Sequence, residues 1–559
     1  MIGYTDLKDQ SKHSMSIKRT ILRPVAFLAG RHADRQRRAF LNTLNRPKNI
    51  QQQVLDELID THKQTDFGRD HSLGSVKTVE DFKKATPVRT YEEMRPYMDR
   101  VYQGDTTALL PKDHDVLMFS LTSGTTGMPK RIPVTQRFAD TMRSGSNIWG
   151  IAALRDHPDG WLRSIMRISS PMREYTSPSG VPCGAISGLL MQNQKKIVRR
   201  MYVTPEAVAA IEDPEVKYYT ICRCGAARDV SMIITANPSS TIAMIETGQR
   251  HAERLIRDIA DGTLTAPGEL SKEIARSIKF KPNKHLARRI QTGLDRDGML
   301  LPKHFWNPSL LANWTGGTLK LYLKRLGELF GDTPVRDLGL LASEGRFSIP
   351  LSSEASGGVA EIMGNFLEFM PTEQQRSDQP DTLGAHELEV GGEYFLIVTN
   401  WAGLWRYDLG DRVKVTGHME NTPIFEFLSR GEHTANITGE KITEHQVVEA
   451  MRIASHECDT HVDTFVMQGH FASTPYYQMQ IEADSTENLQ RLGDLMDHTL
   501  GQLNIEYGAK RKSGRLGPIR PATLPTGTLR KAELVKIAAR KGRSEQYKHQ
   551  YLLTAIVED

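Results

Sequence analysis

The sequence predicts an α/β protein with a large N-terminal domain and a small C-terminal α+β domain. Helical patterns alternate with short apolar runs through most of the chain, and near residue 430 the pattern changes to two helices around two strands. The chain of 559 residues also exceeds the size at which a single hydrophobic core usually stops growing. We therefore expect two domains, residues 1–429 and 430–559, with a hinge at residues 428–432.

Two segments of the larger domain carry helical signals. Residues 51–63 place apolar side chains at the three- and four-residue spacing of an amphipathic helix. A longer helix is expected over residues 239–262. Ser239 or Ser240 would cap its N-terminus, and Gly262 would end it.

Short apolar runs predict buried strands in the larger domain, at residues 116–121, 230–235, 335–340 and 392–399. The smaller domain reads as helix, strand, strand, helix at residues 444–454, 462–468, 476–483 and 489–503. A compact unit of this kind is typical of a separate domain.

A turn after the first predicted strand carries two glycines, four hydroxyl residues and one lysine. Glycines can adopt positive φ, which lets backbone N–H groups converge into an anion-binding nest. The run lacks the Lys that directly follows the second glycine of a Walker A loop. Taken alone, it is equally typical of an ordinary loop. Its candidate phosphate ligands are Ser123, Gly124, Thr125, Thr126, Gly127 and Lys130.

Composition excludes several classes of protein. Lys and Arg total 72 against 67 Asp and Glu, and this net charge of +5 is weak support for a nucleic-acid partner. We interpret the basic clusters at residues 31–38, 195–200 and 510–515 as solvated faces. Four cysteines are too few for a disulfide framework at this length.

The apolar run at residues 20–30 is interrupted by Arg23 and Pro24, unlike a signal peptide. No apolar stretch reaches the roughly 18 residues of a membrane span. We expect a cytoplasmic protein without a nucleic-acid or membrane partner.

Two acidic positions are further candidates. Glu344 follows Ser343 just after the apolar run 335–340, and a carboxylate suits Mg²⁺, a hard cation that prefers oxygen ligands. In isolation, such a Ser-Glu pair is more often a structural cap. Asp411 ends the run 403–411, and its carboxylate can accept hydrogen bonds from two sugar hydroxyls.

Together these segments resemble the adenylate-forming enzymes, which include acyl-CoA synthetases and the adenylation domains of peptide synthetases. The glycine-rich turn resembles their phosphate loop, and Ser343–Glu344 resembles their nucleotide and Mg²⁺ site. Residues 429–444 resemble their hinge and the start of their mobile C-terminal domain. The resemblance implies that Arg430 and Glu432 lie at the hinge.

A second set of motifs narrows the resemblance to the acyl acid amido synthetases. In plants these enzymes join auxin or jasmonate to amino acids, and bacterial members exist. The motifs occur in the family's order at residues 81–83, 90–97, 101–105, 180–188, 366–371, 405–411, 504–507 and 545–548. The resemblance therefore extends over nearly the whole chain.

The resemblance implies ATP and Mg²⁺ as cofactors, and two half-reactions. A carboxylic acid attacks the α-phosphate of ATP to give acyl-AMP and pyrophosphate. The small domain then turns, and an amine such as an amino acid attacks the acyl carbon. Glu344 would bind Mg²⁺, and Lys441 would stabilise charge on the α-phosphate. The implied nucleotide-binding residues are Ser123, Gly124, Thr125, Thr126, Gly127, Lys130, Ser343, Glu344, Asp411, Arg430 and Lys441.

Several alternatives stay open. Lys441 could instead be an exposed lysine beside a helix, and the second catalytic lysine could be Lys531 or Lys548. The family usually carries an adenine-stacking aromatic residue near Glu344, where this chain has Leu340, Leu341 and Ala342, so Phe347 is a substitute at best. The chain could also be an acyl-CoA or carrier-protein ligase, or a non-catalytic nucleotide-binding relative.

Overall fold

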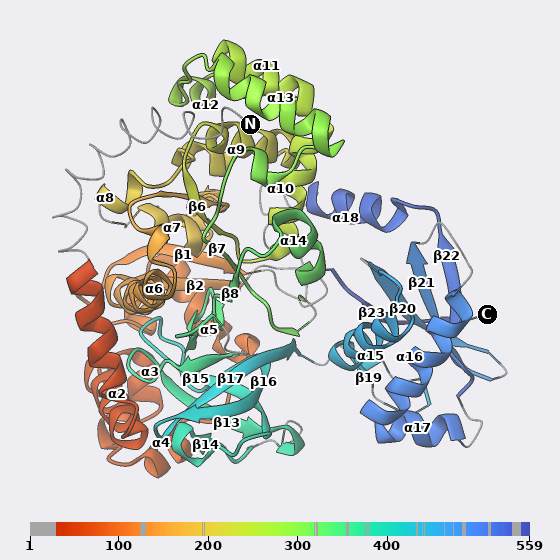
Figure 1. The fold of residues 1–559 in the computed structure, drawn as a ribbon. Coiled ribbons are helices and arrows are strands. Elements are labelled where there is room, and N and C mark those ends of the chain that lie inside the picture. The colour runs from red at the N-terminus through yellow and green to blue at the C-terminus, as the bar shows by residue number, and fades with distance from the viewer. Residues whose placement is uncertain are drawn as a thin grey trace.

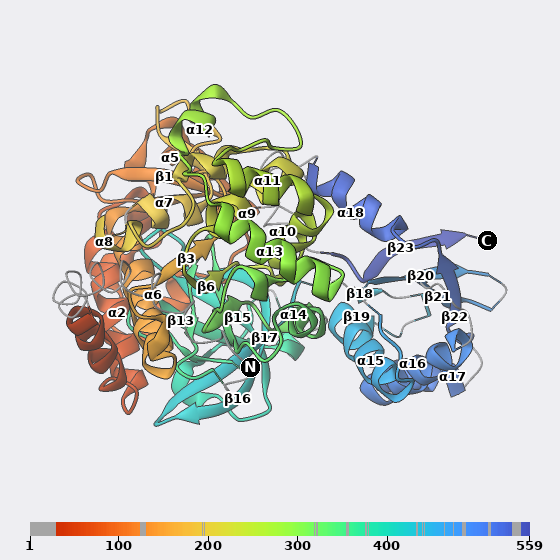
Figure 2. The ribbon, with the colours of Figure 1, turned by 45° about the horizontal axis from the view of Figure 1, so that its top comes forward.

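The computed structural model describes residues 30–558, except 123–129, 193, 195, 318, 320–321, 354–356, 375–376, 378, 432–433, 436, 439, 441, 463, 473, 483–487, 513–515 and 539–548. It contains a larger and a smaller lobe, which both views show (Figures 1 and 2). The larger lobe ends with strand β17, and the smaller one holds the C-terminal elements. The fold is thus mixed α/β with a separate C-terminal domain.

The described residues of the larger lobe form three main sheets and a hairpin. A parallel sheet has the order β3 (Ser164–Arg167), β6 (Val230–Ile234), β7 (Leu310–Asn313), β8 (Val335–Asp337). A second sheet has the order β2 (Lys130–Thr135), β1 (Val116–Thr122), β5 (Pro182–Gly184), β4 (Tyr175–Thr176). An antiparallel sheet has the order β11 (Ser348–Ile349), β12 (Gly358–Ala360), β17 (Thr422–Arg430), β16 (Tyr407–Met419), β15 (Glu393–Thr399), β13 (Phe366–Pro371), β14 (Leu383–Gly384). The hairpin pairs β9 (Leu341–Ala342) with β10 (Gly345–Arg346).

Helices surround these sheets. Residues 30–41 are helical, and the elements that follow are α2 (Pro47–His62), α3 (Asp66–Asp70), α4 (Val79–Ala85), α5 (Tyr91–Gln103), α6 (Gln136–Asp156), α7 (Ile186–Gln192), α8 (Lys196–Arg199), α9 (Pro214–Ala226), α10 (Pro238–Arg250), α11 (Ala252–Asp261), α12 (Lys272–Ser277), α13 (Lys284–Asp297) and α14 (Tyr322–Phe330). Helices α9, α10, α11 and α13 gather on one side of the parallel sheet, and α6 lies on the other (Figure 2).

The smaller lobe has its own core, drawn from residues between 435 and 552. Its four-stranded sheet has the order β22 (Arg520–Leu524), β21 (Tyr476–Glu482), β20 (Phe465–Phe471), β23 (Leu552–Glu558). Beside it are the pair β18 (Thr434–Ala435) and β19 (Ile442–Thr443), and helices α15 (Glu444–Glu457), α16 (Leu489–Leu503), α17 (Ile505–Lys512) and α18 (Thr528–Ala538). The predicted helix–strand–strand–helix pattern is confirmed, and the tail adds both outer strands.

Three local expectations were wrong: the extent of one helix, its N-cap and the end of one strand. The helix expected over residues 239–262 is two helices, α10 and α11, because the backbone leaves the helical conformation at His251, whose ring contacts Glu215 of α9. Pro238 occupies the first turn of α10, so the cap is Asn237, whose side chain accepts the N–H of Ser239 at 2.9 Å. Gly262 ends α11 as expected.

The strand expected at residues 335–340 stops at Asp337, where the side chain redirects the backbone. The Asp337 carboxylate accepts the N–H of Thr315 at 2.6 Å and the N–H of Gly339 at 2.5 Å. Gly339 has a φ of 79°, which a residue with a Cβ rarely adopts. The chain therefore turns at the carboxyl end of β8 and enters the β9–β10 hairpin.

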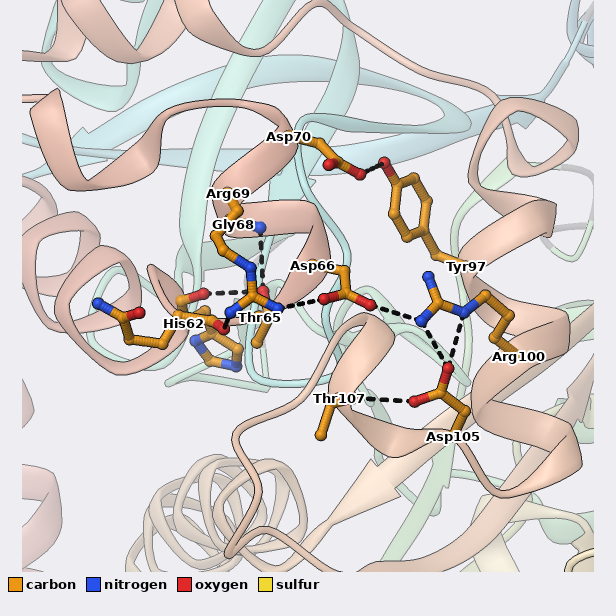
Figure 3. Close-up of polar contacts among 11 residues, drawn as sticks. His62, Thr65, Asp66, Gly68, Arg69, Asp70, Tyr97, Arg100, Asp105 and Thr107 are labelled. Carbon is orange, nitrogen blue, oxygen red and sulfur yellow. Dashed lines mark hydrogen bonds and ion pairs between the residues drawn. The ribbon is translucent and has the colours of Figure 1, made fainter.

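A polar network fixes the position of α5 in the larger lobe (Figure 3). The Asp66 carboxylate of α3 accepts a hydrogen bond from Arg100 of α5, which holds the pKa of Asp66 below its ordinary value. Arg100 also donates from Nε to Asp105 at 2.8 Å. At the other end of α5, the Tyr91 hydroxyl accepts the N–H of Arg131 at 2.8 Å. Helix α5 thus positions strand β2, whose first residue is Lys130.

Candidate active site

A cavity of about 850 Å³ lies in the larger lobe. Its walls come from the helix at residues 30–41, from α6, α7, β3, β6 and β17, and from the segment that follows β8. Ser343, Glu344 and Asp411 all lie in this wall. The structure therefore brings the adjacent residues Ser343 and Glu344 together with Asp411, which lies far from them in the sequence. The carboxyl edge of a parallel sheet, where two of them lie, is the usual ligand position in open α/β folds.

Glu344 lies in the tight turn of the β9–β10 hairpin. Asn400 Nδ2 donates to the Glu344 carbonyl oxygen at 2.6 Å, which fixes the turn against β15. A Cβ on Gly345 would lie 2.8 Å from the Phe347 ring, so glycine is required after Glu344. Both Glu344 carboxylate oxygens are buried, and the residue is 0% exposed. Glu344 thus lies in the cavity wall with its carboxylate shielded from bulk solvent.

Asp411 and Arg430 are paired opposite one another on β16 and β17. The next residue, Gly431, donates its N–H to the carbonyl of Gly410 at 2.6 Å. Asp408 accepts the N–H of Gly410 at 2.8 Å, and burial raises the pKa of Asp408. The hairpin thus places a cavity-lining carboxylate beside the strand end that leads to the smaller lobe.

Lys130 lies outside the cavity wall, in an aromatic pocket. Its Nζ donates to the Tyr407 hydroxyl at 2.9 Å. The same nitrogen lies 5.6 Å from the ring centroid of Tyr91 and 5.5 Å from that of Tyr407. Tyr407 is the first residue of β16, so Lys130 contacts the strand that carries Asp411.

Eight of the candidate residues lie outside the described part of the chain: Ser123, Gly124, Thr125, Thr126, Gly127, Glu432, Lys441 and Lys548. For Arg430 the structure describes the backbone in β17. The neighbour of Lys441 is well anchored: Glu440 accepts N–H groups from Ile437 at 2.7 Å and Thr438 at 2.8 Å, and the Tyr477 hydroxyl.

Lys531 is exposed on the first turn of α18, away from the cavity. Its neighbour Arg530 contacts Glu246 of α10 at 3.4 Å and Glu533 at 2.7 Å, which docks α18 on the larger lobe. No described residue of the smaller lobe lies in the cavity wall. In this arrangement Lys531 is not brought to Glu344 and Asp411.

Phe347, at best a substitute for an adenine-stacking residue, does not lie in the cavity wall. Phe347 is 0% exposed and belongs to the main hydrophobic core, because its position follows the hairpin turn inward. Trp314 instead lies in the cavity wall beside Leu340 and Leu341, with its indole N–H donated to the Gly339 carbonyl at 3.0 Å. No local pattern of the sequence indicates this position, since Trp314 follows the polar Asn313 rather than an apolar residue.

Two buried ionisable residues, Arg346 and Glu361, lie in and behind the cavity wall. Arg346 lies in the wall, donates to the Leu338 carbonyl at 2.8 Å, and has its pKa lowered to about 10 by burial. Burial also raises the pKa of Glu361 to about 7, although the N–H groups of Gly364 and Met363 oppose this rise. Sequence reasoning missed this pair, since a partly charged core gives no periodic signal.

The basic cluster at residues 31–38 is not only a solvated face. His32, Ala33 and Gln36 lie in the cavity wall, while Asp34 pairs with Arg38 at 2.8 Å on the helix surface.

The described residues contain no group of three or more His, Cys, Asp or Glu side chains that could hold a metal ion. No described helix combines the length and apolar character that crossing a bilayer requires.

The fold is that of the acyl acid amido synthetases. The chain superposes on the GH3.15 acyl acid amido synthetase with a TM-score of 0.78 at 22% identity, covering 92% of this chain and 93% of that one. For the AtGH3.15 acyl acid amido synthetase in complex with 2,4-DB the TM-score is 0.82 at 21% identity, covering 93% and 94%.

The chain belongs to the GH3 family. The family's N-terminal domain matches residues 36–335, its central domain residues 359–430 and its C-terminal domain residues 445–555. Relatives include the jasmonoyl–L-amino acid synthetase JAR4 of Nicotiana attenuata, 25% identical over 86% of this chain and 87% of that protein. The indole-3-acetic acid-amido synthetase GH3.4 of Arabidopsis thaliana is 24% identical over 91% of this chain and 90% of that protein.

Proposed function

We propose that this chain is an ATP-dependent ligase that activates a carboxylic acid as an acyl adenylate and transfers the acyl group to an amine, an amino acid. The observation that carries the proposal is the meeting of Ser343, Glu344 and Asp411 in one cavity of a GH3-family fold. Catalysis of adenylation asks the protein mainly for positioning and neutralisation of charge.

For the first half-reaction we assign the ribose to Asp411 and the phosphates to residues 123–127 and Lys130. Lys130 must leave its contact with Tyr407 to do so. Glu344 fits an Mg²⁺ ligand, because this ion is usually bound by one or two carboxylates together with substrate phosphates rather than by a cage of protein ligands. When bound, Mg²⁺ neutralises charge on those phosphates.

We place the adenine ring between Trp314 and the segment 340–342. Stacking of a base on an aromatic side chain contributes about 1–3 kcal/mol. Trp314→Ala should therefore raise the KM for ATP by about tenfold, and Trp314→Phe should restore most of the loss. An unchanged KM in the alanine variant would place adenine elsewhere.

For the second half-reaction we propose that residues 430–559 turn about a hinge at residues 428–432, with Arg430 and Glu432 at the pivot. Separate cores in the two lobes support this boundary. Rotation of the smaller lobe must break the contact between Arg530 and Glu246. The same rotation would move Lys441 away from the acyl phosphate and bring other groups of the smaller lobe to it. Either Lys531 or Lys548 is the second catalytic lysine.

We expect the reaction to occur in the cytoplasm, where the four buried free cysteines would stay reduced. Its test is pyrophosphate release over a panel of carboxylic acids, followed by product analysis with an amino-acid panel or with CoA. Amide products with amino acids support the proposal. Consumption of acyl-AMP only with CoA would indicate a thioester-forming ligase, and no release with any acid a non-catalytic relative.

A further inference from the structure

We infer that the acid substrate carries an extended apolar tail, which lies between α6 and the parallel sheet. The inference rests on the proposed function, since it concerns the same cavity. Beyond the nucleotide residues the cavity continues as a slot between these two elements, which we call the tail slot. It is bordered by Gly150, Leu154, Trp161, Ile165, Met232 and Ile234.

One stripe of α6 forms a wall along the whole cavity. Asp140, Arg143, Asn147, Gly150 and Leu154 line it, at the three- and four-residue spacing of one helix face. Arg346 lies at the nucleotide end of this wall. It packs so closely on α6 that a Cβ on Gly145 would lie 2.4 Å from the Arg346 side chain. From Gly145 to Leu154 the helix rises about 14 Å, enough for a chain on the order of ten carbon atoms.

The opposite wall of the tail slot is one face of the sheet. Ile165 and Ile234 are partly buried. Their neighbours along the strands, Met166 and Ile233, point to the other face of the sheet, where both are 0% exposed in a separate core. The apolar side chains of this sheet face therefore border space that a ligand can fill.

The far end of the tail slot is closed by the helix at residues 30–41. Gly30 packs so closely that a Cβ there would lie 2.8 Å from the Trp161 ring. Asn147 donates to Gln36 at 3.0 Å, and Arg155 lies 3.5 Å from Asp34, so two contacts hold this helix on α6. The six residues that border the tail slot carry no charge, whereas Arg143 and Arg346 lie toward the nucleotide end of the cavity, which suits a carboxylic acid with an apolar tail.

Burial of each methylene in the tail slot should improve binding by up to about fourfold. The test uses the full-length protein with ATP and Mg²⁺, and measures pyrophosphate release with benzoate and with straight-chain acids from hexanoate to dodecanoate. We expect kcat/KM to rise at least tenfold from hexanoate to dodecanoate. Equal or better activity with benzoate and hexanoate would overturn the inference and leave the proposed function intact.

Gly150 allows a matched pair of variants. A Cβ on Gly150 would meet nothing within 4 Å, and the same holds for Gly327 on α14, which lies outside the cavity wall. Gly150→Phe should lower kcat/KM for dodecanoate at least tenfold and leave hexanoate within twofold. Gly327→Phe should change neither. Equal losses for both acids in Gly150→Phe would contradict the tail slot.

A binding measurement separates the two proposals. If no acid drives pyrophosphate release, the proposed function falls, and calorimetric titration with dodecanoate decides what the tail slot binds. Binding that Gly150→Phe weakens and Gly327→Phe does not would support an apolar-tail site. Absence of dodecanoate binding would overturn the inference.

Discussion

Neighbouring residues of the parallel sheet face two different environments. Met166 and Ile233 pack in a closed core that also contains residues of α9 and α10, whereas Ile165 and Ile234 border the cavity. Because successive side chains of a strand point to opposite faces, one strand serves both purposes. The comparison teaches that the closed core and the cavity wall are built from alternate positions of the same strands, so each can be changed separately.

Polar anchors explain how α6 can stand beside the sheet without filling the space. The Trp149 indole N–H donates to the Asp337 carbonyl at 2.8 Å. Arg336 of β8, fully buried, pairs with Asp156 at the end of α6 at 2.6 Å. These contacts fasten α6 to β8 and leave the space next to β3 and β6 open.

The largest expected effect tests the two faces directly. Ile233→Ala should reduce the free energy of unfolding by about 3 kcal/mol, because it leaves a void in a closed core. Ile234→Ala should cost about 1 kcal/mol, since the residue already borders a cavity. Denaturant unfolding of both variants measures the difference. Equal losses would show that the cavity face is packed as tightly as the other.

Substitutions in the cavity wall should change enzymatic activity rather than the free energy of unfolding. Glu344→Gln should lower pyrophosphate release by about a hundredfold, because an amide is a poor substitute for a carboxylate at a metal–phosphate complex. Its thermal unfolding should stay within a few degrees of the parent. Release at the parental rate would remove Glu344 from the site.

Behind the wall, Glu361 should make stability depend on pH. Its folded pKa of about 7 exceeds the ordinary value of 4.5, so between these values the folded state binds more protons than the unfolded state. Stability must then fall as pH rises through this window. From pH 5 to pH 8 the parent should lose about 2 kcal/mol more than Glu361→Gln. Parallel pH profiles would contradict the raised pKa.

The smallest of these effects concerns the ribose. Asp411→Asn should raise the KM for ATP about tenfold, or about 1.4 kcal/mol, with a smaller change in kcat. Glu420→Gln, an exposed position near the tip of the same hairpin, is the control and should change neither. A KM that stays at the parental value in Asp411→Asn would refute the ribose assignment.

Local sequence patterns predicted much of the fold correctly, including helix α2 and strands β1, β6 and β15. The meeting of Glu344 with Asp411 was also predictable, because the motifs around them are long and ordered. The positions of Trp314 and Gly150 in the cavity wall were not predictable, since they depend on which face of a distant element these residues meet. The break in the helix at His251 was not predicted, because His251 contacts Glu215, a residue of another helix.

The last residue pair of β16 and β17 joins Asp411 to Arg430, where the chain leaves for the smaller lobe. A nucleotide held at Asp411 would therefore stiffen the strand from which that lobe departs. Departure of AMP would loosen it and let the lobe return.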